Sequence, residues 1–410
     1  MKILQISKFF PPAKGGIESV TFELAEGFSR QGVCGDVLCF NSSGAGRSER
    51  SGSGYEVVRV GSWGMLMSTP LAPALILQTL RRRSAYDVIH VHMPNPMAAL
   101  AIWIARPKAQ IVVHWHSDVV RQQRGLKFYK PLQDWLLKRA DAIVATSEIY
   151  AQASACLSAF HGKTEIIPLG IGDPVLTLDI DRSRRLRERY AGKKVIFALG
   201  RMTYYKGFDV LVKAARLLPA DSLVVIAGGG ALLSSLRAQA RRLGVADRVQ
   251  FLGNIDEADK LAYLQMADVF CMPSVARSEA YGLAMVEAMA MGKPIVSTDI
   301  SGSGASWINQ SGVTGLTVPV GDPEQLARAI AKLLADPASA ARMGRAARQR
   351  YVDELQADKM MDSIFLLYRR LLSGFVSTGF VPTIRSAGLE RTPGRRDASA
   401  DATTPTEKNP

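Results

Sequence analysis

Residues 269–287 of this chain have the sequence VFCMPSVARSEAYGLAMVE, which combines an apolar run, a polar loop and the start of a helix. The apolar run Val269–Met272 has the length and residue types of a buried strand. Gly282 indicates that a helix begins just after it, which leaves Glu279 in the loop and Glu287 about one turn into the helix. The segment therefore predicts one strand–loop–helix unit, and the rest of the chain repeats this order.

Short apolar runs alternate with helical patterns almost throughout. Runs rich in Val and Ile predict strands at residues 2–7, 57–60, 88–91, 111–114, 142–146, 195–199, 223–227, 249–252, 269–272 and 295–298. Between the first two runs, one helical face is formed by Ile17, Val20, Leu24 and Phe28. Strands separated by helices indicate crossover units, so the fold class is α/β with parallel sheets.

The alternation weakens over the charged stretch Asp173–Lys194 and restarts at Val195. A chain of 410 residues is long enough for about two domains. We therefore expect two doubly wound domains, at residues 1–175 and 190–353. Residues 375–410 lose apolar periodicity, and their end is rich in Pro, Thr, Arg and Ala, so we expect them to be disordered.

Composition narrows the class of protein. No apolar run reaches the roughly 18–20 residues that cross a bilayer, and the N-terminus turns polar too soon for a signal peptide. The four cysteines form no CxxC pair, which argues against a disulfide framework or a structural zinc site and favours a reducing, cytoplasmic compartment. A formal net charge of +14 fits an anionic partner, whether nucleic acid, an anionic membrane or a phosphorylated substrate.

Ligands of open parallel sheets bind beyond the carboxyl ends of the strands, so the residues after each strand matter most. Arg201 and Lys206 lie five apart in the loop after Val195–Leu199 and could hold a diphosphate together. The amides of residues 282–284 would point at an anion from the start of a helix. Glu279 then offers a carboxylate to sugar hydroxyls and Glu287 one to a ribose, although both glutamates could also be solvated charges.

The N-terminal half offers a second loop and a group of histidines. Gly15 and Gly16 precede a helix, where a backbone without side chains can approach an anion, but the loop lacks the GxGxxG spacing and could be a plain turn. Two predicted strands end in the pairs His90/His92 and His114/His116. These histidines could bind a metal, serve a catalytic site at His116, or be satisfied in the core.

At these residues the sequence resembles the retaining glycosyltransferases of family 4, which have the GT-B fold: two Rossmann-like doubly wound domains that face a cleft, with a C-terminal helix that crosses back. The resemblance covers roughly residues 1–372, and its specific part is the E-x7-E pattern of Glu279 and Glu287. A stripe of apolar residues predicts the crossing helix at about 354–373: Met360, Met361, Ile364, Leu367, Tyr368 and Leu371.

The resemblance also implies which residues act. The catalytic set is His116, Glu279, Arg201 and Lys206. The donor-binding set is Gly15, Gly16, Arg201, Lys206, Glu279, Tyr281, Gly282, Leu283 and Glu287. By this resemblance the basic pair neutralises the leaving diphosphate of a nucleoside-diphosphate sugar, Glu287 bonds the ribose, and His116 contacts the transferred sugar near its reacting carbon.

The resemblance further implies attack from the face that the leaving group departs, with retention of configuration and without a metal or other cofactor. The only Asp-x-Asp sequence of the metal-binding type is Asp179–Asp181, which lies in the charged stretch and not after a strand, so we expect it to belong to the linker. The runs 298–304 and 116–122 look like those of mannosyl- and rhamnosyl-transferring members that use GDP-sugars. Backbone near Gly253–Ile255 would hold the base.

Residues 121–139 suggest an acceptor at a membrane. Basic and aromatic residues alternate there, which suits an anionic membrane surface, and Arg81–Arg83 could add to it. We therefore expect a glycan or polyprenyl-diphosphate-linked glycan acceptor of surface polysaccharide (lipopolysaccharide) assembly, and a protein peripheral on the inner face of the cell membrane. The same stretch could equally be an ordinary basic helix whose apolar face packs on the core.

Other functions compete with sugar transfer. A nucleotide-sugar epimerase on the same fold would turn over the donor with no acceptor present. A phosphorylase would need a cofactor lysine and a longer chain. A glycosidase could use Glu279 and Glu287 as its two carboxylates, but the basic and glycine-rich phosphate-binding features would then have no role. A basic nucleic-acid-binding protein is motivated by charge alone and lacks a reader motif, so we expect no nucleic acid partner.

Overall fold

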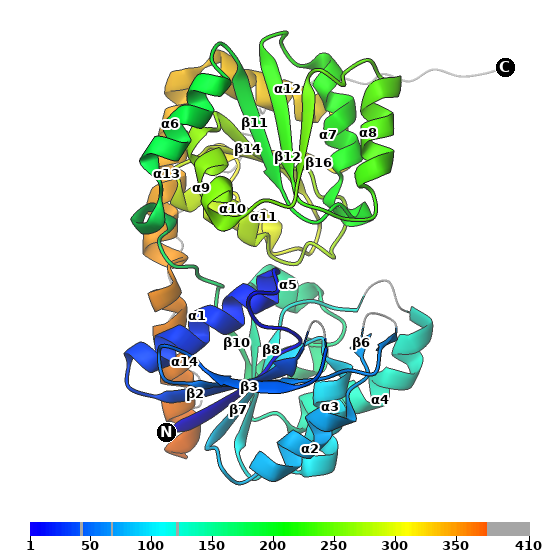
Figure 1. Ribbon diagram of the computed structural model, residues 1–410, viewed down its shortest axis with the longest axis vertical. Helices are drawn as coiled ribbons and strands as arrows, with labels where there is room; N and C mark the ends of the chain where they lie inside the picture. The colour runs from blue at the N-terminus through cyan, green and yellow to red at the C-terminus, as the bar shows by residue number, and fades with distance from the viewer. Residues whose placement is uncertain (42–43, 67–68, 120–122, 375–410) are drawn as a thin grey trace, which may run out of the picture. The chain divides into compact units, whose positions relative to one another are not determined.

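The chain forms two large, mainly parallel sheets (Figure 1). The computed structural model describes residues 1–41, 44–66, 69–119 and 123–374, with the main chain alone for residues 123–126. Residues 1–374 form one compact unit, so the expected division into domains at 175–190 stays a prediction. The expected disorder of residues 375–410 lies outside the described residues.

The first sheet has eight strands: β1 (Lys2–Ile6), β2 (Cys34–Phe40), β3 (Arg47–Arg50), β4 (Glu56–Val60), β7 (Val88–Met93), β8 (Gln110–Trp115), β9 (Ala142–Ala145) and β10 (Thr164–Ile166). Their order is β10-β9-β8-β7-β1-β2-β4-β3, and the edge strand β3 alone among them runs antiparallel. A separate antiparallel pair consists of β5 (Met65–Leu66) and β6 (Thr69–Pro70).

The second sheet has six parallel strands: β11 (Lys194–Leu199), β12 (Ser222–Ala227), β13 (Val249–Gly253), β14 (Val269–Met272), β15 (Ile295–Asp299) and β16 (Gly315–Pro319). Their order is β13-β12-β11-β14-β15-β16. Strand order therefore reverses between β11 and β14, as it does between β1 and β7 in the first sheet. Such switch points are where open α/β sheets bind ligands.

Helices connect the strands. Those of the first half are α1 (Gly16–Arg30), α2 (Pro73–Arg82), α3 (Pro96–Ala105), α4 (Gln123–Arg139) and α5 (Glu148–Ala153). Those of the second half are α6 (Ile180–Arg189), α7 (Phe208–Ala214), α8 (Leu233–Arg242), α9 (Glu257–Met266), α10 (Leu283–Ala290), α11 (Ala305–Ile308), α12 (Pro323–Ala335), α13 (Pro337–Glu354) and α14 (Ala357–Leu372). In α1 the predicted apolar face is the buried one, with Val20, Leu24 and Phe28 inside.

The fold class predicted from the sequence is confirmed, and each of the ten predicted strands is present within one or two residues. The strands that the sequence did not predict have weaker patterns. Gly35 and Asp36 interrupt the apolar run of β2, and β3 is charged and fully exposed. Strand β10 has three residues, while β16 begins with a glycine and ends with a proline.

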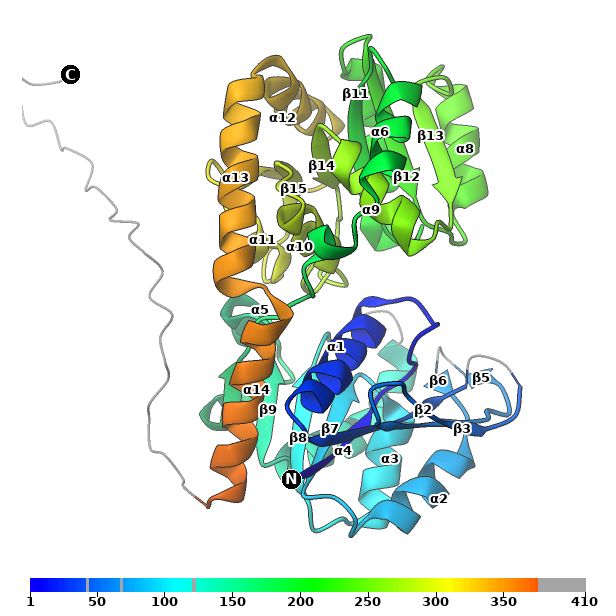
Figure 2. The ribbon, with the colours of Figure 1, turned by 60° about the vertical axis from the view of Figure 1, so that its left-hand side comes forward.

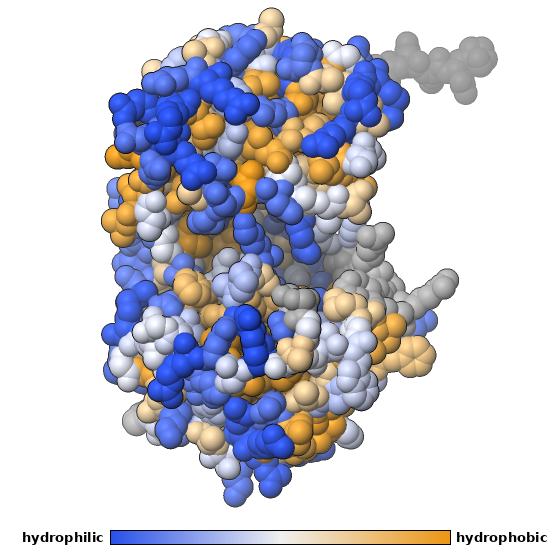
Figure 3. Space-filling view, viewed as in Figure 1, coloured by the Kyte–Doolittle hydropathy of each residue, from blue (hydrophilic) through white to orange (hydrophobic). Residues whose placement is uncertain are grey.

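The stretch expected to be a linker contains α6. Asp179 caps this helix by accepting a hydrogen bond from the Arg182 amide at 2.9 Å, which gives the Asp-x-Asp sequence a structural role. Arg182 and Arg187 then pair with Asp259 and Asp268 at 2.7 and 3.1 Å. Figure 3 shows hydrophilic residues gathered where Figure 1 places α6.

The chain runs between the two sheets twice, and the two passages lie side by side. The Ile171 amide donates to the Leu355 carbonyl at 3.1 Å, and the Ala357 amide donates to the Ile171 carbonyl at 2.9 Å. The hydroxyl of the buried Tyr351 donates to that same Ile171 carbonyl at 3.0 Å. Gly170 allows this approach, because a Cβ there would lie 2.2 Å from the Gln356 oxygen.

Helix α14 runs back along the first sheet (Figure 2). Its Met361 packs over Gly27 of α1, and its Tyr368 ring lies 5.7 Å from the Phe28 ring. The Tyr368 hydroxyl also bonds to His90 of β7. These contacts suit the crossing helix expected at about 354–373. No helix among the described residues is both long and apolar enough to cross a bilayer.

We expect Gly170→Ala to destabilise the protein by about 2–3 kcal/mol, because the new methyl group must push the two passages apart. Urea denaturation should show a lower midpoint. Gly172→Ala is the matched control, since its Cβ would meet the Glu23 carboxylate at an ordinary 3.4 Å. Equal midpoints for the two variants would contradict this account of the passage.

Candidate active site

Lys206 and Glu279 form a buried ion pair at the switch point of the second sheet. Lys206 Nζ lies 2.5 Å from Glu279 Oε2, and both side chains are about nine-tenths buried. The Ser274 hydroxyl donates to the same carboxylate oxygen at 2.9 Å. Gly200 makes room for the lysine, because a Cβ there would lie 2.9 Å from Lys206 Cε. The structure thus joins two residues that the sequence placed in one site.

The loops after β11 and β14 are bonded together. The Val275 amide donates to the Tyr205 carbonyl at 2.7 Å, and the Tyr204 and Ser278 hydroxyls bond at 3.0 Å. Gly207, at φ +63°, packs so closely on Pro273 that a Cβ would lie 1.9 Å from its carbonyl oxygen. The basic loop and the E-x7-E segment therefore form one unit.

Helix α10 starts where the sequence predicted. Gly282 precedes it with φ +93°, a left-handed conformation that glycine adopts without strain. Within the described part of the chain, the amides of residues 282–284 have no hydrogen-bond acceptor. Such amides carry the positive end of the helix dipole, which makes this point a ready site for an anion.

Arg201 is an exposed cation in the loop after β11. Its guanidinium has no ion-pair partner among the residues that the structure describes. Lys8, in the loop after β1, lies close enough for the charge of Arg201 to affect its pKa. Burial is the main cause that lowers the pKa of Lys8; the Glu18 carboxylate opposes this effect, and the charge of Arg201 adds to it. Cationic side chains from both halves of the chain therefore share one region.

The glycine pair of the N-terminal loop faces this unit. A Cβ on Gly16, at the start of α1, would lie 3.2 Å from Leu283 Cδ1 at the start of α10. A Cβ on Gly15 would collide with the Glu18 carboxylate. Lys14 Nζ donates to the Ile255 carbonyl at 2.7 Å, so this lysine already uses part of the backbone that we expected to hold the base.

His116 directly follows β8 and belongs to a buried group of four histidines. His92 Nδ1 lies 2.9 Å from His116 Nε2, and the His114 and His116 rings stack with centroids 4.2 Å apart. Nitrogens of His90, His92 and His114 lie within 4.8 Å of one another, a spacing that would allow a metal. Both nitrogens of His92 are, however, already bonded, to His116 and to Gln5. Burial lowers the pKa of His116 to about 3.

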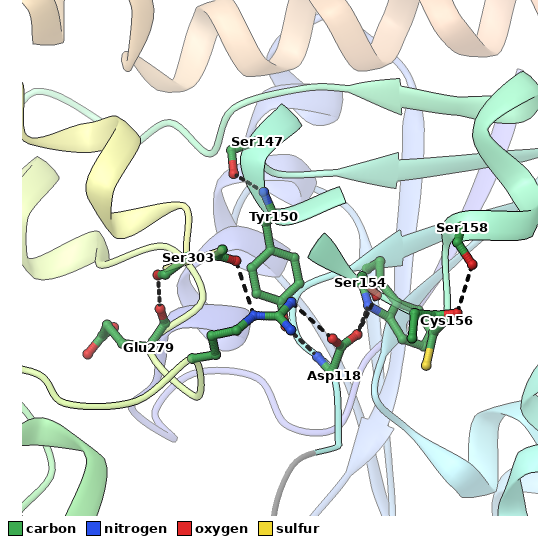
Figure 4. Close-up of polar contacts among 12 residues, drawn as sticks. Asp118, Ser147, Tyr150, Ser154, Cys156, Ser158, Glu279 and Ser303 are labelled. Atoms are coloured by element: carbon green, nitrogen blue, oxygen red, sulfur yellow. Dashed lines mark hydrogen bonds and ion pairs between the residues drawn. The ribbon is translucent and has the colours of Figure 1, made fainter. Parts of the chain in front are cut away.

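Asp118 and Arg277 connect His116 with Glu279. Arg277 Nη2 donates to Asp118 Oδ2 at 3.2 Å, while Ser154 donates to Asp118 Oδ1 at 2.7 Å (Figure 4). Ser303 donates its hydroxyl to the Glu279 carbonyl, so the loop after β15 holds the main chain of this glutamate in place (Figure 4). The loops after β8, β14 and β15 thus meet at Arg277, a residue that no sequence motif singled out.

Two further predicted donor-binding residues, besides Lys206 and Glu279, have protein partners. Glu287 Oε1 lies 2.5 Å from Lys260 Nζ of α9. Burial lowers the pKa of Lys260, but the Glu287 and Glu257 carboxylates outweigh it and raise that pKa overall. The Tyr281 side chain is buried, and its hydroxyl donates to the Leu169 carbonyl at 2.9 Å. Any donor contact of Tyr281 therefore has to come from its main chain.

Comparisons with known proteins identify the family. Residues 15–170 match the family model "Glycosyl transferase 4-like domain", and residues 179–350 match "Glycosyl transferases group 1". The chain is 34% identical to O-antigen chain mannosyltransferase C of Escherichia coli over 378 residues, 91% of this chain and 99% of the relative. It is 36% identical to D-rhamnosyltransferase WbpZ of Pseudomonas aeruginosa over 353 residues, 86% and 91% of the two chains.

A third relative is the GDP-mannose-dependent alpha-(1-6)-phosphatidylinositol monomannoside mannosyltransferase of Mycolicibacterium smegmatis, at 31% identity over 375 residues, 86% of this chain and 94% of the relative. Among solved structures, Anabaena HepE in complex with UDP and glucose superposes with a TM-score of 0.74 at 22% identity, over 92% of this chain and all of that one. That likeness supports the fold.

We expect Lys206→Met to destabilise the protein by about 3 kcal/mol, because it leaves a buried carboxylate whose one remaining partner among the described residues is Ser274. Lys213→Met is the control, since the pair of Lys213 with Asp209 is half-exposed and should contribute under about 1 kcal/mol. In the double variant with Glu279→Gln, the two losses should be far from additive. Additive losses in chemical denaturation would show that the pair is not coupled.

Proposed function

The chain belongs to the family 4 glycosyltransferases, and on that premise we propose that it transfers a mannose- or rhamnose-type hexose from a GDP-sugar to a glycan or lipid-linked glycan of surface polysaccharide biosynthesis. The observation that carries the proposal is the Lys206–Glu279 pair, which joins the loop after β11, where Arg201 also stands, to the loop that leads into α10. A nucleotide-sugar donor and a glycan acceptor follow from the family. The guanine base and the kind of hexose rest on the names of the relatives and on the runs 298–304 and 116–122.

The chemistry proposed is retaining transfer. The bond between the anomeric carbon and the diphosphate oxygen breaks, and an acceptor hydroxyl bonds that carbon from the same face. The acceptor proton goes to an oxygen of the leaving diphosphate. Fixed cations and main-chain amides stabilise the charge that develops on that group without rearranging during the reaction. In this scheme Arg201 and Lys206 face the diphosphate, Glu279 the sugar and Glu287 the ribose.

Gly16 completes the phosphate pocket in this proposal. It lies against Leu283, so a diphosphate at the start of α10 would also meet the start of α1. The Arg277–Asp118 pair keeps the loop of His116 beside the loop of Glu279. Arg201 and Lys206 supply the positive charge that a metal ion would otherwise bring to the diphosphate. We therefore expect activity to need no metal or other cofactor.

The donor proposal predicts selective stabilisation by GDP over UDP and ADP in thermal-shift assays. GDP-mannose should be turned over only when an acceptor is present, at the same rate with EDTA. Arg201→Met should weaken GDP binding about 10- to 100-fold, the range for a lost hydrogen bond to a charged group. Arg237→Met, which removes an exposed arginine from α8, is the matched control.

Two outcomes would contradict this donor assignment. Selective stabilisation by UDP would fit the nucleotide seen in HepE and would replace the guanine base. Turnover of the donor without any acceptor would favour an epimerase on the same fold.

We further propose that α4 brings the protein to an anionic membrane surface. Tyr129, Leu132, Trp135 and Leu136 pack on the core, as an ordinary amphipathic helix would. Phe128 instead is 90% exposed beside the exposed Lys127. Of the other basic residues, Lys130 and Arg139 pair with Asp134 and Asp141, Arg121 lies outside the described residues and the Arg124 side chain is not described.

Vesicle sedimentation tests this surface. The protein should be enriched on phosphatidylglycerol vesicles over phosphatidylcholine vesicles, and Phe128→Ser with Lys127→Glu should lower binding at least fivefold. Leu176→Ser is the control, because Leu176 is a similarly exposed apolar residue, at 84%, in the second half. Equal binding to both kinds of vesicle would remove the membrane proposal.

A further inference from the structure

A chain of hydrogen bonds leads from α1 through the first sheet to His116. The Gln5 amide nitrogen donates to the Thr21 carbonyl at 3.2 Å, and Gln5 Oε1 lies 3.1 Å from His92 Nε2. His92 Nδ1 in turn lies 2.9 Å from His116 Nε2. Gln5, His92 and His116 stand on or directly after β1, β7 and β8, and all three are buried.

Gln5 fixes which atoms donate and which accept along this chain of hydrogen bonds. A carbonyl oxygen such as that of Thr21 can only accept, so the Gln5 NH2 group must face it. The Gln5 oxygen therefore faces His92, and His92 Nε2 must carry a proton in order to donate to it. A flipped Gln5 amide would set its oxygen against the Thr21 carbonyl oxygen, and neither atom can donate.

His92 then determines which nitrogen of His116 carries a proton. Burial, together with the neighbouring His90 and His116, keeps the pKa of His92 well below its ordinary value, so His92 is neutral. A neutral imidazole has one N–H, and in His92 it is at Nε2. His92 Nδ1 is then an acceptor, and among the described residues its donor is His116 Nε2–H.

We propose that Gln5 and His92 are positioning residues that fix His116 in the tautomer with its proton on Nε2, so that His116 Nδ1 presents a lone pair to the ligand. No described residue hydrogen-bonds to Nδ1. A lone pair at this place accepts a hydrogen bond from a hydroxyl group and repels a phosphate or carboxylate oxygen.

The ligand group that fits is a hydroxyl of the transferred sugar, and this part rests on the proposed function. His116 neither gives nor stores a proton in this arrangement, because its one N–H is held by His92. The pair His90–His114 differs, since its chain ends at His114 Nε2, a fully buried atom that has no hydrogen-bond partner in the part of the chain that the structure describes. The polar chain through Gln5 is thus the one with an open acceptor at its end.

Nitrogen NMR of the protein labelled with ¹⁵N-histidine tests the tautomer without any substrate. Two-bond couplings from ring protons distinguish a protonated from a bare nitrogen, and His116→Asn assigns the signal. In the unaltered protein we expect protonated Nε2 and bare Nδ1. Gln5→Met should mix the two tautomers of His116. Gln5→Glu in its protonated form, which can donate to the Thr21 carbonyl and accept from His92 as the amide does, should keep the original one, and the signal of the exposed His161 should not change.

Kinetics with GDP-mannose then test the ligand. Gln5→Met should lower kcat/KM about fivefold, the effect of one neutral hydrogen bond, and Gln5→Glu should restore it. One monodeoxy donor should be insensitive to Gln5→Met, since it lacks the hydroxyl that Nδ1 accepts.

The outcomes separate the two proposals. A protonated Nδ1 or a doubly protonated ring in the unaltered protein would overturn the relay, and so would a Gln5→Met protein that is folded and keeps the tautomer. If Gln5→Met fails to fold, the measurement on the unaltered protein still decides. Absence of turnover with every donor would refute the proposed function and leave the tautomer result standing.

Discussion

The buried pair of Lys206 and Glu279 is the interaction on which the rest of the site depends. At 2.5 Å and about nine-tenths buried, neither charge has much water to stabilise it, so each needs the other. The pair lies at the reversal of strand order in the second sheet and joins the basic loop after β11 to the loop that begins α10. A diphosphate bound here would share the lysine with the carboxylate, whereas Arg201 could meet it directly.

Contacts between the two halves place the first sheet's residues around that pair. Lys14 reaches the Ile255 carbonyl, Gly16 packs on Leu283, and Asp118 holds Arg277. None of these contacts is a large apolar interface. Each joins loops at the carboxyl ends of strands, which are the parts of an α/β sheet that bind ligands. The two chain segments that run between the sheets also pack on each other, at Gly170 and Gln356.

Much of this could be predicted from the sequence, because its signals are local. The buried runs and Gly282 at a helix start follow from spacing and backbone conformation. The unpredicted parts depend on tertiary contacts. Arg277 is a single arginine in a loop, and its pairing with Asp118 spans 159 residues of sequence. Tyr281 is the opposite case. It lies within the E-x7-E segment and was predicted to bind the donor, yet its hydroxyl donates to the Leu169 carbonyl. The histidine pairs were visible, but the order Gln5–His92–His116 needs the register of three strands.

The central claim is that one pocket, built from the loop after β11 and the start of α10, holds the donor diphosphate. A crystal structure of the protein with GDP tests it most directly. We predict phosphate oxygens within hydrogen-bonding distance of both the Arg201 guanidinium and the amides of residues 282–284, with Gly16 beside them. A diphosphate bound elsewhere, such as the basic groove formed by Arg189, Arg237 and Arg241, would contradict it.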